Sequence, residues 1–397
     1  MKNKSNNSLI VLVLDLLFAN IINIFDFIRN FATDMQLKSL SIDNFKNIKS
    51  ARLTFSPKIN GLLGNNGMGK SNLLDAIYTL SFCKSFSGVT DSLLIRQDDD
   101  FAILKGEYDR RGTEEELLMG FTRGRRKSLK RKGKEYQRLS EHIGTFPLVI
   151  VSPADIDLIR EGAEERRRLM DMTISQSDAR YLDHLIRYGR TLEQRNKMLR
   201  DNISDRTLFE ALEAGMDLSA RYIVEARSMW VKRLRPIFQK YYQLISGSGE
   251  MPKLEYATQL DEASLADLLE RNRHRDEILR HTSAGPHRDD LRLTLCGMEM
   301  RRTGSQGQCK SFTIALRLAQ YEFLREITGM KPLLLLDDIF DKLDAGRVER
   351  IMQIVEDPEF GQIFITDTNR THLDEIVRRT ADDFRLWEVT RGEFTPL

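Results

Sequence analysis

The first part of the chain alternates short apolar runs with turn-forming residues, a pattern typical of β-strands. Strands are predicted for residues 37–42, 51–55 and 59–63, separated by asparagine and proline. A glycine-rich stretch follows the third run directly. The pattern therefore predicts a sheet whose last strand leads into a tight loop.

The middle of the chain has a helical pattern. Residues 163–245 contain few glycines and almost no proline, and apolar side chains recur at helical spacing, as at Leu182, Leu185 and Ile186. A Ser-Gly repeat at residues 246–249 ends this region. We expect a lobe of several helices.

Strand-like and helix-like segments alternate again in the last part of the chain, which is typical of an α/β domain. The predicted segments are a helix at 265–281, a strand at 291–295, a helix at 310–328, a strand at 332–336, a further helix and a strand at 362–366. We therefore expect one α/β domain split by a helical insertion. The predicted boundaries are 35–160 for its first part, 161–284 for the helical lobe and 285–397 for its second part.

Composition excludes several classes of protein. The 397 residues include 61 Lys plus Arg and 59 Asp plus Glu, which leave a formal net charge of +2. A uniformly basic nucleic-acid coat protein and an acidic solvating tail are both excluded. The three cysteines are far apart and form no C-x-x-C pair, so we expect neither a disulfide framework nor a zinc cluster, and we expect a cytoplasmic protein.

An apolar stretch at residues 9–28 has almost the length of a membrane span. Four polar residues interrupt it, namely Asp15, Asn20, Asn23 and Asp26. Because aspartate is costly inside a bilayer, a membrane function is disfavoured, and no signal-peptide cleavage pattern follows. Strand-like sequence begins at Met35, so we interpret Met35 as the natural start and residues 1–34 as an extension.

The glycine-rich stretch matches the phosphate-binding pattern G-x-x-x-x-G-K-[ST]. Its residues are Gly64, Asn65, Asn66, Gly67, Met68, Gly69, Lys70 and Ser71. Glycines let backbone amides surround phosphate oxygens, Lys70 neutralises the β- and γ-phosphates, and the Ser71 hydroxyl ligates Mg²⁺. The predicted strand before it and the helix-like sequence after it supply the required context, so ATP and Mg²⁺ are the expected cofactors.

An apolar run at residues 333–336 ends in Asp337 and Asp338. This is the form of a buried parallel strand whose carboxyl end faces a ligand crevice. We expect Asp337 to hold Mg²⁺, directly or through water, and Asp338 to orient or deprotonate the attacking water.

A third motif, Ser305-Gln306-Gly307-Gln308, comes just before the predicted helix at 310–328. It could be an ordinary helix cap, but its place one helix before the acidic strand resembles the signature of ATP-binding-cassette ATPases. That resemblance implies that it binds the γ-phosphate held by a second subunit. Asp341 and Asp344 follow the acidic strand and resemble the loop that those enzymes place at the dimer interface.

These motifs together resemble the RecF family of bacterial recombination mediators along nearly all of residues 35–397. The resembling stretches are 42–48, 64–71 with 75–78, 152–155, 166–168, 285–291 and 305–308. Only 267 positions separate Lys70 from Asp337, which excludes the long coiled coils of SMC proteins. The resemblance implies an ABC-type P-loop ATPase head with a mixed sheet, split by a helical lobe.

The resemblance also implies an activity and partners. We expect an ATP-induced homodimer that binds gapped DNA or junctions of single-stranded and double-stranded DNA. Its implied partners are RecO and RecR, and indirectly RecA, which they help to load. No histidine follows Thr366 at the position of the transporter-type switch, which favours slow hydrolysis.

Three basic or turn-rich segments carry alternative interpretations. Residues 123–134 hold eight cations and could be a solvated hairpin or a phosphate-backbone contact. The candidate DNA contacts are Arg123, Arg125, Arg126, Lys130, Arg131 and Lys132. The stretch 285–290 is either a salt-bridged turn or part of the nucleotide or DNA interface. Residues 166–168 are interpreted as a solvated helix start in preference to a phosphate contact.

Three functions fit these motifs. The first is an ATP-gated clamp that grips DNA as a dimer. The second is a nucleotide-dependent scaffold that recruits repair partners. The third, a transport ATPase, is disfavoured because one interrupted apolar segment cannot build a translocation pathway.

Overall fold

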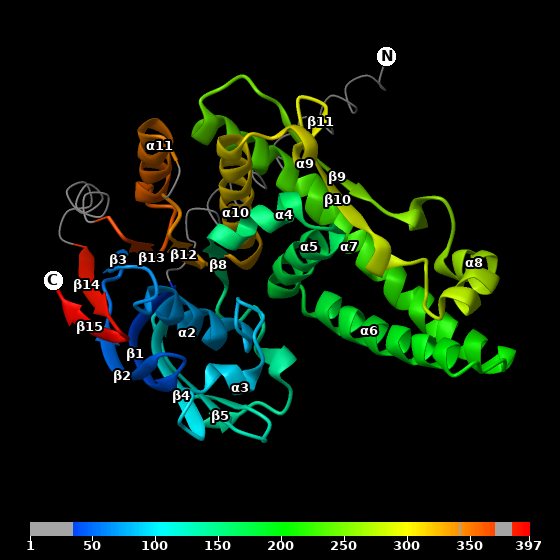
Figure 1. Cartoon of the computed structure of the whole chain (residues 1–397), viewed down its shortest axis with the longest axis horizontal. Helices are drawn as coiled ribbons and strands as arrows, with labels where there is room; N and C mark the ends of the chain where they lie inside the picture. Colours follow the sequence, from blue (N-terminus) through cyan, green and yellow to red (C-terminus); the bar gives the residue numbers. More distant parts are fainter. Residues whose placement is uncertain (1–34, 341–342, 370–382) are drawn as a thin grey trace, which may run out of the picture.

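The computed structural model describes residues 35–340, 343–369 and 383–397 (Figure 1). The apolar segment at residues 9–28 and the predicted extension at 1–34 lie outside these ranges. None of the helices within the described ranges has the length and apolar character needed to cross a bilayer.

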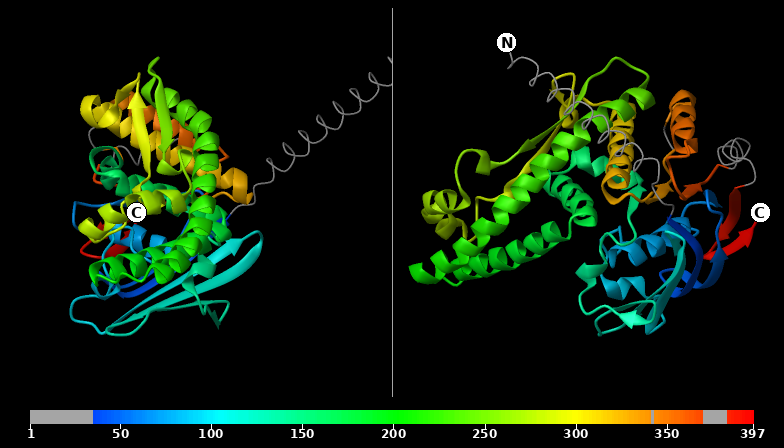
Figure 2. Two further views of the ribbon diagram at one scale, coloured as in Figure 1. Left: turned by 90° about the vertical axis from the view of Figure 1, so that its right-hand side faces the viewer. Right: turned by 180° about the vertical axis from the view of Figure 1, so that it is seen from behind.

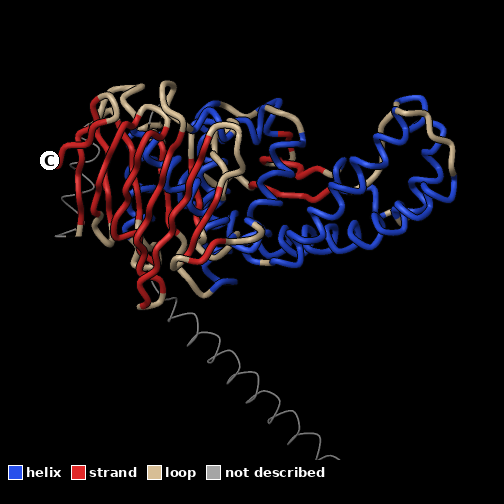
Figure 3. Tube along the Cα trace, turned by 90° about the horizontal axis from the view of Figure 1, so that it is seen from below, coloured by secondary structure: helices blue, strands red, loops and turns tan. Residues whose placement is uncertain are grey.

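Strands gather at one end of the molecule, which we call the head, and helices extend away from it as the helical lobe (Figure 3). The head contains two six-stranded sheets. The first has the order β2-β1-β4-β5-β6-β7, and all of its pairings are antiparallel. Its strands are β1 (Met35–Phe45), β2 (Ile48–Thr54), β4 (Phe101–Arg110), β5 (Thr113–Thr122), β6 (Ser128–Arg131) and β7 (Lys134–Glu135).

The second sheet has the order β15-β14-β3-β13-β12-β8 and is parallel except for the pairing of β14 with β15. Its strands are β3 (Ile59–Leu63), β8 (Leu148–Val151), β12 (Leu333–Asp337), β13 (Ile363–Asp367), β14 (Phe384–Thr390) and β15 (Glu393–Pro396). Every residue of β12 and β13 is buried. Such strands occur where helices or sheets cover both faces of a parallel sheet.

Helices α2 (Lys70–Phe82) and α10 (Gln306–Thr328) supply those two covers. Leu333 and Leu335 belong to the apolar core that contains α2 and the antiparallel sheet. Leu334 and Leu336 belong to the core that contains α10. Alternate side chains of one strand therefore join α2 on one face of the sheet to α10 on the other.

The helical lobe consists of α5 (Ala163–Ser177), α6 (Ala179–Arg200), α7 (Arg206–Ser246) and α8 (Leu265–Leu279). Helices α6 and α7 lie side by side (Figure 2). Helix α7 has 41 residues and is about 60 Å long at 1.5 Å per residue. Its second half packs on α10 of the head through ring contacts such as that of Phe238 with Phe312. One helix thus connects the lobe to the head.

Shorter elements make up the rest of the described structure. A small antiparallel sheet beside α7 contains β9 (Pro252–Ala257), β10 (Asp290–Leu295) and β11 (Met298–Glu299). The remaining α-helices of the described residues are α3 (Asp91–Leu94), α4 (Asp157–Arg160), α9 (Met300–Thr303) and α11 (Ala345–Glu356). The single turns of 3₁₀-helix are η1 (Leu139–His142), η2 (Pro153–Ile156), η3 (Gln259–Asp261) and η4 (Pro286–Arg288).

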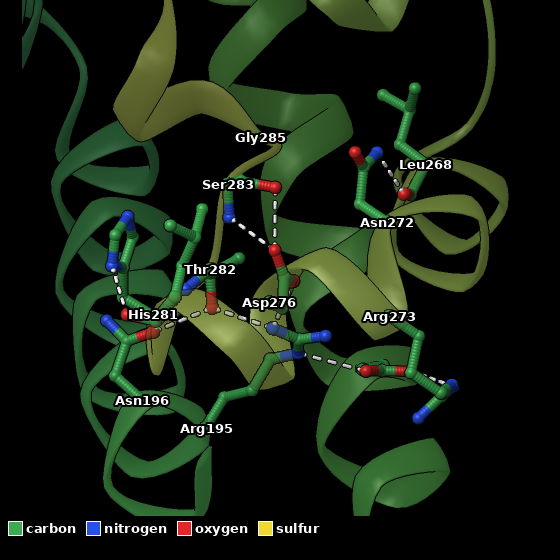
Figure 4. Close-up of polar contacts among 12 residues, drawn as sticks. Arg195, Asn196, Leu268, Asn272, Arg273, Asp276, His281, Thr282, Ser283 and Gly285 are labelled. Atoms are coloured by element: carbon green, nitrogen blue, oxygen red, sulfur yellow. Dashed lines mark hydrogen bonds and ion pairs between the residues drawn. The ribbon is translucent and has the colours of Figure 1, made fainter. Parts of the chain in front are cut away.

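A buried arginine ties the three outer helices of the lobe together (Figure 4). The Arg195 side chain of α6 is fully buried. It donates hydrogen bonds to Glu213 of α7 at 2.9 Å, to Asp276 of α8 at 2.8 Å and to the Thr282 hydroxyl at 2.9 Å. Because a buried charge is costly unless it is paired, these contacts fix the relative positions of the helices.

The stretch 285–290 forms a salt-bridged turn between α8 and β10, and it pairs with α5. Arg166 donates to both carboxylate oxygens of Asp290 at 2.7 and 3.0 Å, and Arg167 donates to the Asp289 carbonyl at 2.7 Å. Gly285 has a φ of +127°, and a Cβ there would lie 2.5 Å from the Tyr188 hydroxyl. The predicted solvated helix start is therefore wrong for Arg166 and Arg167, because distant carboxylate and carbonyl groups pair with both guanidinium groups.

Candidate nucleotide site

The phosphate-binding loop connects β3 to α2, as the sequence predicts. Gly67 and Gly69 have φ angles of +78° and +116°, a region that side chains with a Cβ rarely adopt. A Cβ on Gly64 would lie 2.4 Å from the Val389 carbonyl oxygen of β14. Glycine is therefore required here by backbone conformation and by close packing.

The Lys70 side chain bends back over this loop. Its Nζ donates to the carbonyl oxygens of Gly64 at 2.7 Å and Asn65 at 3.2 Å. These contacts keep the ammonium group at the loop, where a phosphate oxygen would be the stronger partner.

Asn47 and Gly392 hold the loop in place through the Met68 carbonyl. Asn47 Nδ2 donates to the Met68 carbonyl at 3.3 Å, and Asn72 donates to Asn47 Oδ1 at 2.8 Å. The Gly392 amide donates to the same Met68 carbonyl at 2.7 Å. The phosphate-binding pattern contains neither Asn47 nor Gly392, so their role depends on the fold.

Ser71 and Asp337 meet where β12 ends. The Ser71 hydroxyl donates to Asp337 Oδ1 at 2.8 Å. Burial raises the pKa of the Asp337 carboxyl above its usual range, because desolvation disfavours the charged carboxylate. A hydroxyl and a carboxylate are oxygen ligands of the kind that Mg²⁺ prefers, so these two residues fit the expected metal.

Thr366 of β13 joins the two acidic residues. In the parallel pairing of β12 with β13, it lies opposite Asp337. Its hydroxyl donates to Asp337 Oδ1 at 2.8 Å and accepts the Asp338 backbone N–H at 2.9 Å. Asp338 has a φ of +45°, which is unusual for a residue with a side chain. The contact with Thr366 holds Asp338 in that conformation. The motifs in the sequence do not indicate that Thr366 belongs to the site.

A cavity of about 810 Å³ opens beside Asp338. Asn66 of the phosphate-binding loop lines it, together with Gln306 and Lys310 of α10. Residues that the sequence places 240 positions apart (306 − 66 = 240) thus share one cavity. Its volume lies within the range of small-molecule sites.

The signature-like motif caps α10. The Ser305 hydroxyl accepts the Gln308 backbone N–H at 3.2 Å, and Gln308 Oε1 accepts the Ser305 backbone N–H at 2.9 Å. The helix therefore begins at Gln306, four residues before the predicted 310. Ser305 and Gln306 are exposed, so a second subunit could reach them.

The predicted dimer-interface loop is only partly described. Asp341 lies outside the described residues. Asp344 caps α11 by accepting the Arg347 backbone N–H at 3.0 Å. Its side chain therefore has a local role whether or not it also contacts a second subunit.

The basic segment runs from the turn after β5 along β6 and into the hairpin that β6 forms with β7. Arg123 donates to four carbonyl oxygens of residues 92–99, and Arg131 donates to both carboxylate oxygens of Glu115. Lys132 lies 3.5 Å from Glu115. Among the six candidate DNA contacts, the side chains that form no hydrogen bond or ion pair with any described residue are those of Arg125, Arg126 and Lys130. These three are the better candidates for DNA contact.

Relatives of known name share almost the whole chain. A DNA replication and repair protein RecF from Parabacteroides distasonis is 52% identical over 363 residues, covering 91% of this chain and 100% of the relative. The protein of the same name from Porphyromonas gingivalis is 48% identical over 361 residues, covering 90% and 99%.

Solved structures agree in fold. The recombination mediator protein RecF-ATP of the RecFOR pathway matches with a TM-score of 0.81 and 30% identity, covering 91% of this chain and 99% of that one. An SMC head domain from Pyrococcus furiosus matches with a TM-score of 0.55 and 18% identity, covering 91% and 96%. The predicted ABC-type ATPase head is confirmed. The RecF/RecN/SMC N-terminal domain family matches residues 36–383, so the chain belongs to this family and, within it, to the RecF proteins.

Proposed function

We propose that this chain is an ATP-dependent DNA-binding protein of DNA replication and recombinational repair. ATP binds at Lys70 and Ser71, and the signature-like motif of a second copy closes on its γ-phosphate. The resulting homodimer grips gapped DNA or a junction of single-stranded and double-stranded DNA. Slow hydrolysis of ATP then releases the DNA.

The contact between Ser71 and Asp337 carries this proposal. It brings the magnesium-binding hydroxyl of the phosphate-binding loop within 2.8 Å of the first acidic residue of β12. These two oxygens would hold Mg²⁺, which would supply positive charge to offset that of the phosphates. Asp338 lines the adjacent cavity and is suited to orient the attacking water.

RecO and RecR are the proposed partners, with RecA loaded as the result. The likeness to RecF of the RecFOR pathway supports this assignment. A scaffold that recruits these partners without gripping DNA is the second candidate function.

The test measures DNA binding by the full chain with ATP, with ADP and without nucleotide, at two salt concentrations, while light scattering follows its mass. We expect a dimer and salt-sensitive DNA binding with ATP alone. Lys70→Met should abolish both. Asp338→Asn should lengthen the lifetime of the ATP-bound complex on DNA.

Other outcomes decide between the candidates. A dimer that forms with ATP but binds DNA no more tightly would favour the scaffold. An Asp338→Asn complex that leaves DNA as fast as the wild type would contradict release by hydrolysis.

A further inference from the structure

Glu250 lies where the helical lobe meets the signature-like motif. It follows the Ser-Gly turn after α7, and one carboxylate oxygen accepts a hydrogen bond of 2.6 Å from Gln308 Nε2. The other oxygen accepts from the Tyr242 hydroxyl at 2.8 Å and the Ser248 hydroxyl at 2.9 Å. The carboxylate therefore binds α7, the turn and the motif at once.

Charge strengthens this contact. The hydrogen bond from Tyr242, followed by those from Gln308 and Ser248, holds the pKa of Glu250 below its usual range. Hydrogen bonds to an ionised acceptor are shorter and stronger than neutral ones. Gln308 is thus held by a carboxylate on one side and by the Ser305 backbone on the other.

The Gln308 amide makes one hydrogen bond through its nitrogen and one through its oxygen, so its orientation is fixed by its own chain. Its effect is to fix the cap of α10, which leaves the exposed Ser305 and Gln306 as the groups that face outward. The first turn of a helix also leaves N–H groups without intrahelical acceptors. Glu250 thereby sets the geometry of the surface that a second copy meets.

The same turn contacts α11. Arg350 donates to the carbonyl oxygens of Ile245 and Ser246 at 3.1 and 3.3 Å. A Cβ on Gly307 would lie 2.3 Å from Arg347 Nη1 of α11. The end of α7, the motif and α11 therefore form one packed unit.

We infer that Glu250 is a positioning residue that couples the helical lobe to the signature-like motif, and that it supports the nucleotide held by the opposite copy of this chain. The inference rests on the proposed ATP-induced homodimer. It predicts that Glu250 acts on dimer closure and not on nucleotide binding by a single copy.

Glu250→Ala and Glu250→Gln test this inference, with Glu255→Ala as the matched control. Glu255 is a half-exposed carboxylate of β9 that pairs with Lys253. For Glu250→Ala we expect a dimer about ten- to hundredfold weaker with ATP, the range for removal of a charge-assisted hydrogen bond. Binding of a fluorescent ATP analogue to the monomer should change less than about twofold. Glu250→Gln, which still offers an oxygen to Gln308, should restore most of the dimer.

Mixed dimers show whether Glu250 acts on the nucleotide held by the opposite copy or on that held by its own copy. Glu250→Ala and Lys70→Met proteins should each hydrolyse ATP poorly alone. When they are mixed, ATP on the Glu250→Ala copy faces the intact motif of the Lys70→Met copy, so hydrolysis should return. Failure of mixing to restore hydrolysis, or wild-type dimerisation by Glu250→Ala, would overturn the inference. If the wild type itself forms no dimer with ATP, the proposed function fails and the inference fails with it.

Discussion

The Ser71 hydroxyl and Asp337 Oδ1 are joined by a hydrogen bond of 2.8 Å across 266 positions of sequence. The fold therefore places the two proposed magnesium ligands next to each other. A metal ion held by them would not have to gather its ligands from distant positions. Preorganisation of this kind lowers the cost of binding.

Thr366 should act through the acidic pair. Thr366→Val removes the hydroxyl that donates to Asp337 and accepts from Asp338. We expect ATP hydrolysis to fall about tenfold, equivalent to the removal of one hydrogen bond of about 1.4 kcal/mol. The measurements are kcat at saturating ATP and the dependence of ATP hydrolysis on the Mg²⁺ concentration. Thr366→Ser should keep most activity, and Thr173→Val, which alters a buried threonine of α5 bonded to the Leu169 carbonyl, should leave kcat unchanged.

Arg125, Arg126 and Lys130, whose side chains pair with no described residue, should govern the salt dependence of DNA binding. Replacing Arg125, Arg126 and Lys130 by alanine should reduce the slope of log affinity against log salt by about one unit for each phosphate that the protein no longer neutralises. Fluorescence anisotropy at several salt concentrations measures the slope. A matched triple variant changes three other exposed cations, Arg221, Lys253 and Arg302. Equal slopes of log affinity against log salt for the two variants would show that Arg125, Arg126 and Lys130 do not contact DNA.

The buried Arg195 should matter for stability. Arg195→Ala leaves Asp276 buried without its cation and Glu213 with Arg273 as its remaining cation, and we expect a loss of about 3–5 kcal/mol in the free energy of unfolding. Urea denaturation followed by circular dichroism measures it. Arg206→Ala breaks an exposed pair with Glu210 and should cost no more than about 0.5 kcal/mol. Similar losses for the two variants would show that the network of Figure 4 does not stabilise the lobe.

Acid should weaken the fold through a buried histidine. Burial lowers the pKa of His142 from 6.5 to about 4, so the unfolded chain binds a proton at this position more readily than the folded one. Its contribution to stability is complete above pH 6.5 and is lost as the pH falls toward 4, by about 3 kcal/mol at most. Urea denaturation between pH 4 and pH 7 should therefore show a shallower decline for His142→Gln, which can still donate to the Leu80 carbonyl. His274→Gln, a change at an exposed histidine, should follow the wild-type profile.

The sequence predicts those parts of the site whose residues lie close together along the chain. The phosphate-binding loop, the acidic strand and the cap at Ser305 each lie within one short segment, so spacing alone reveals them. Thr366 and Glu250 could not be identified in this way, because their partners depend on strand register and on the path of α7. For the same reason, the segment at 123–134 reads as eight equivalent cations, although Glu115 and the carbonyl oxygens of residues 92–99 pair with some of them in the fold.

The last hairpin of the chain also bears on the order of synthesis. The phosphate-binding loop near residue 64 is braced by the Val389 carbonyl and the Gly392 amide, which leave the ribosome more than 300 residues later. A nascent chain therefore carries an unbraced loop throughout most of its translation. The loop should therefore acquire its native packing only once residues 389–392 have been synthesised and have folded against it.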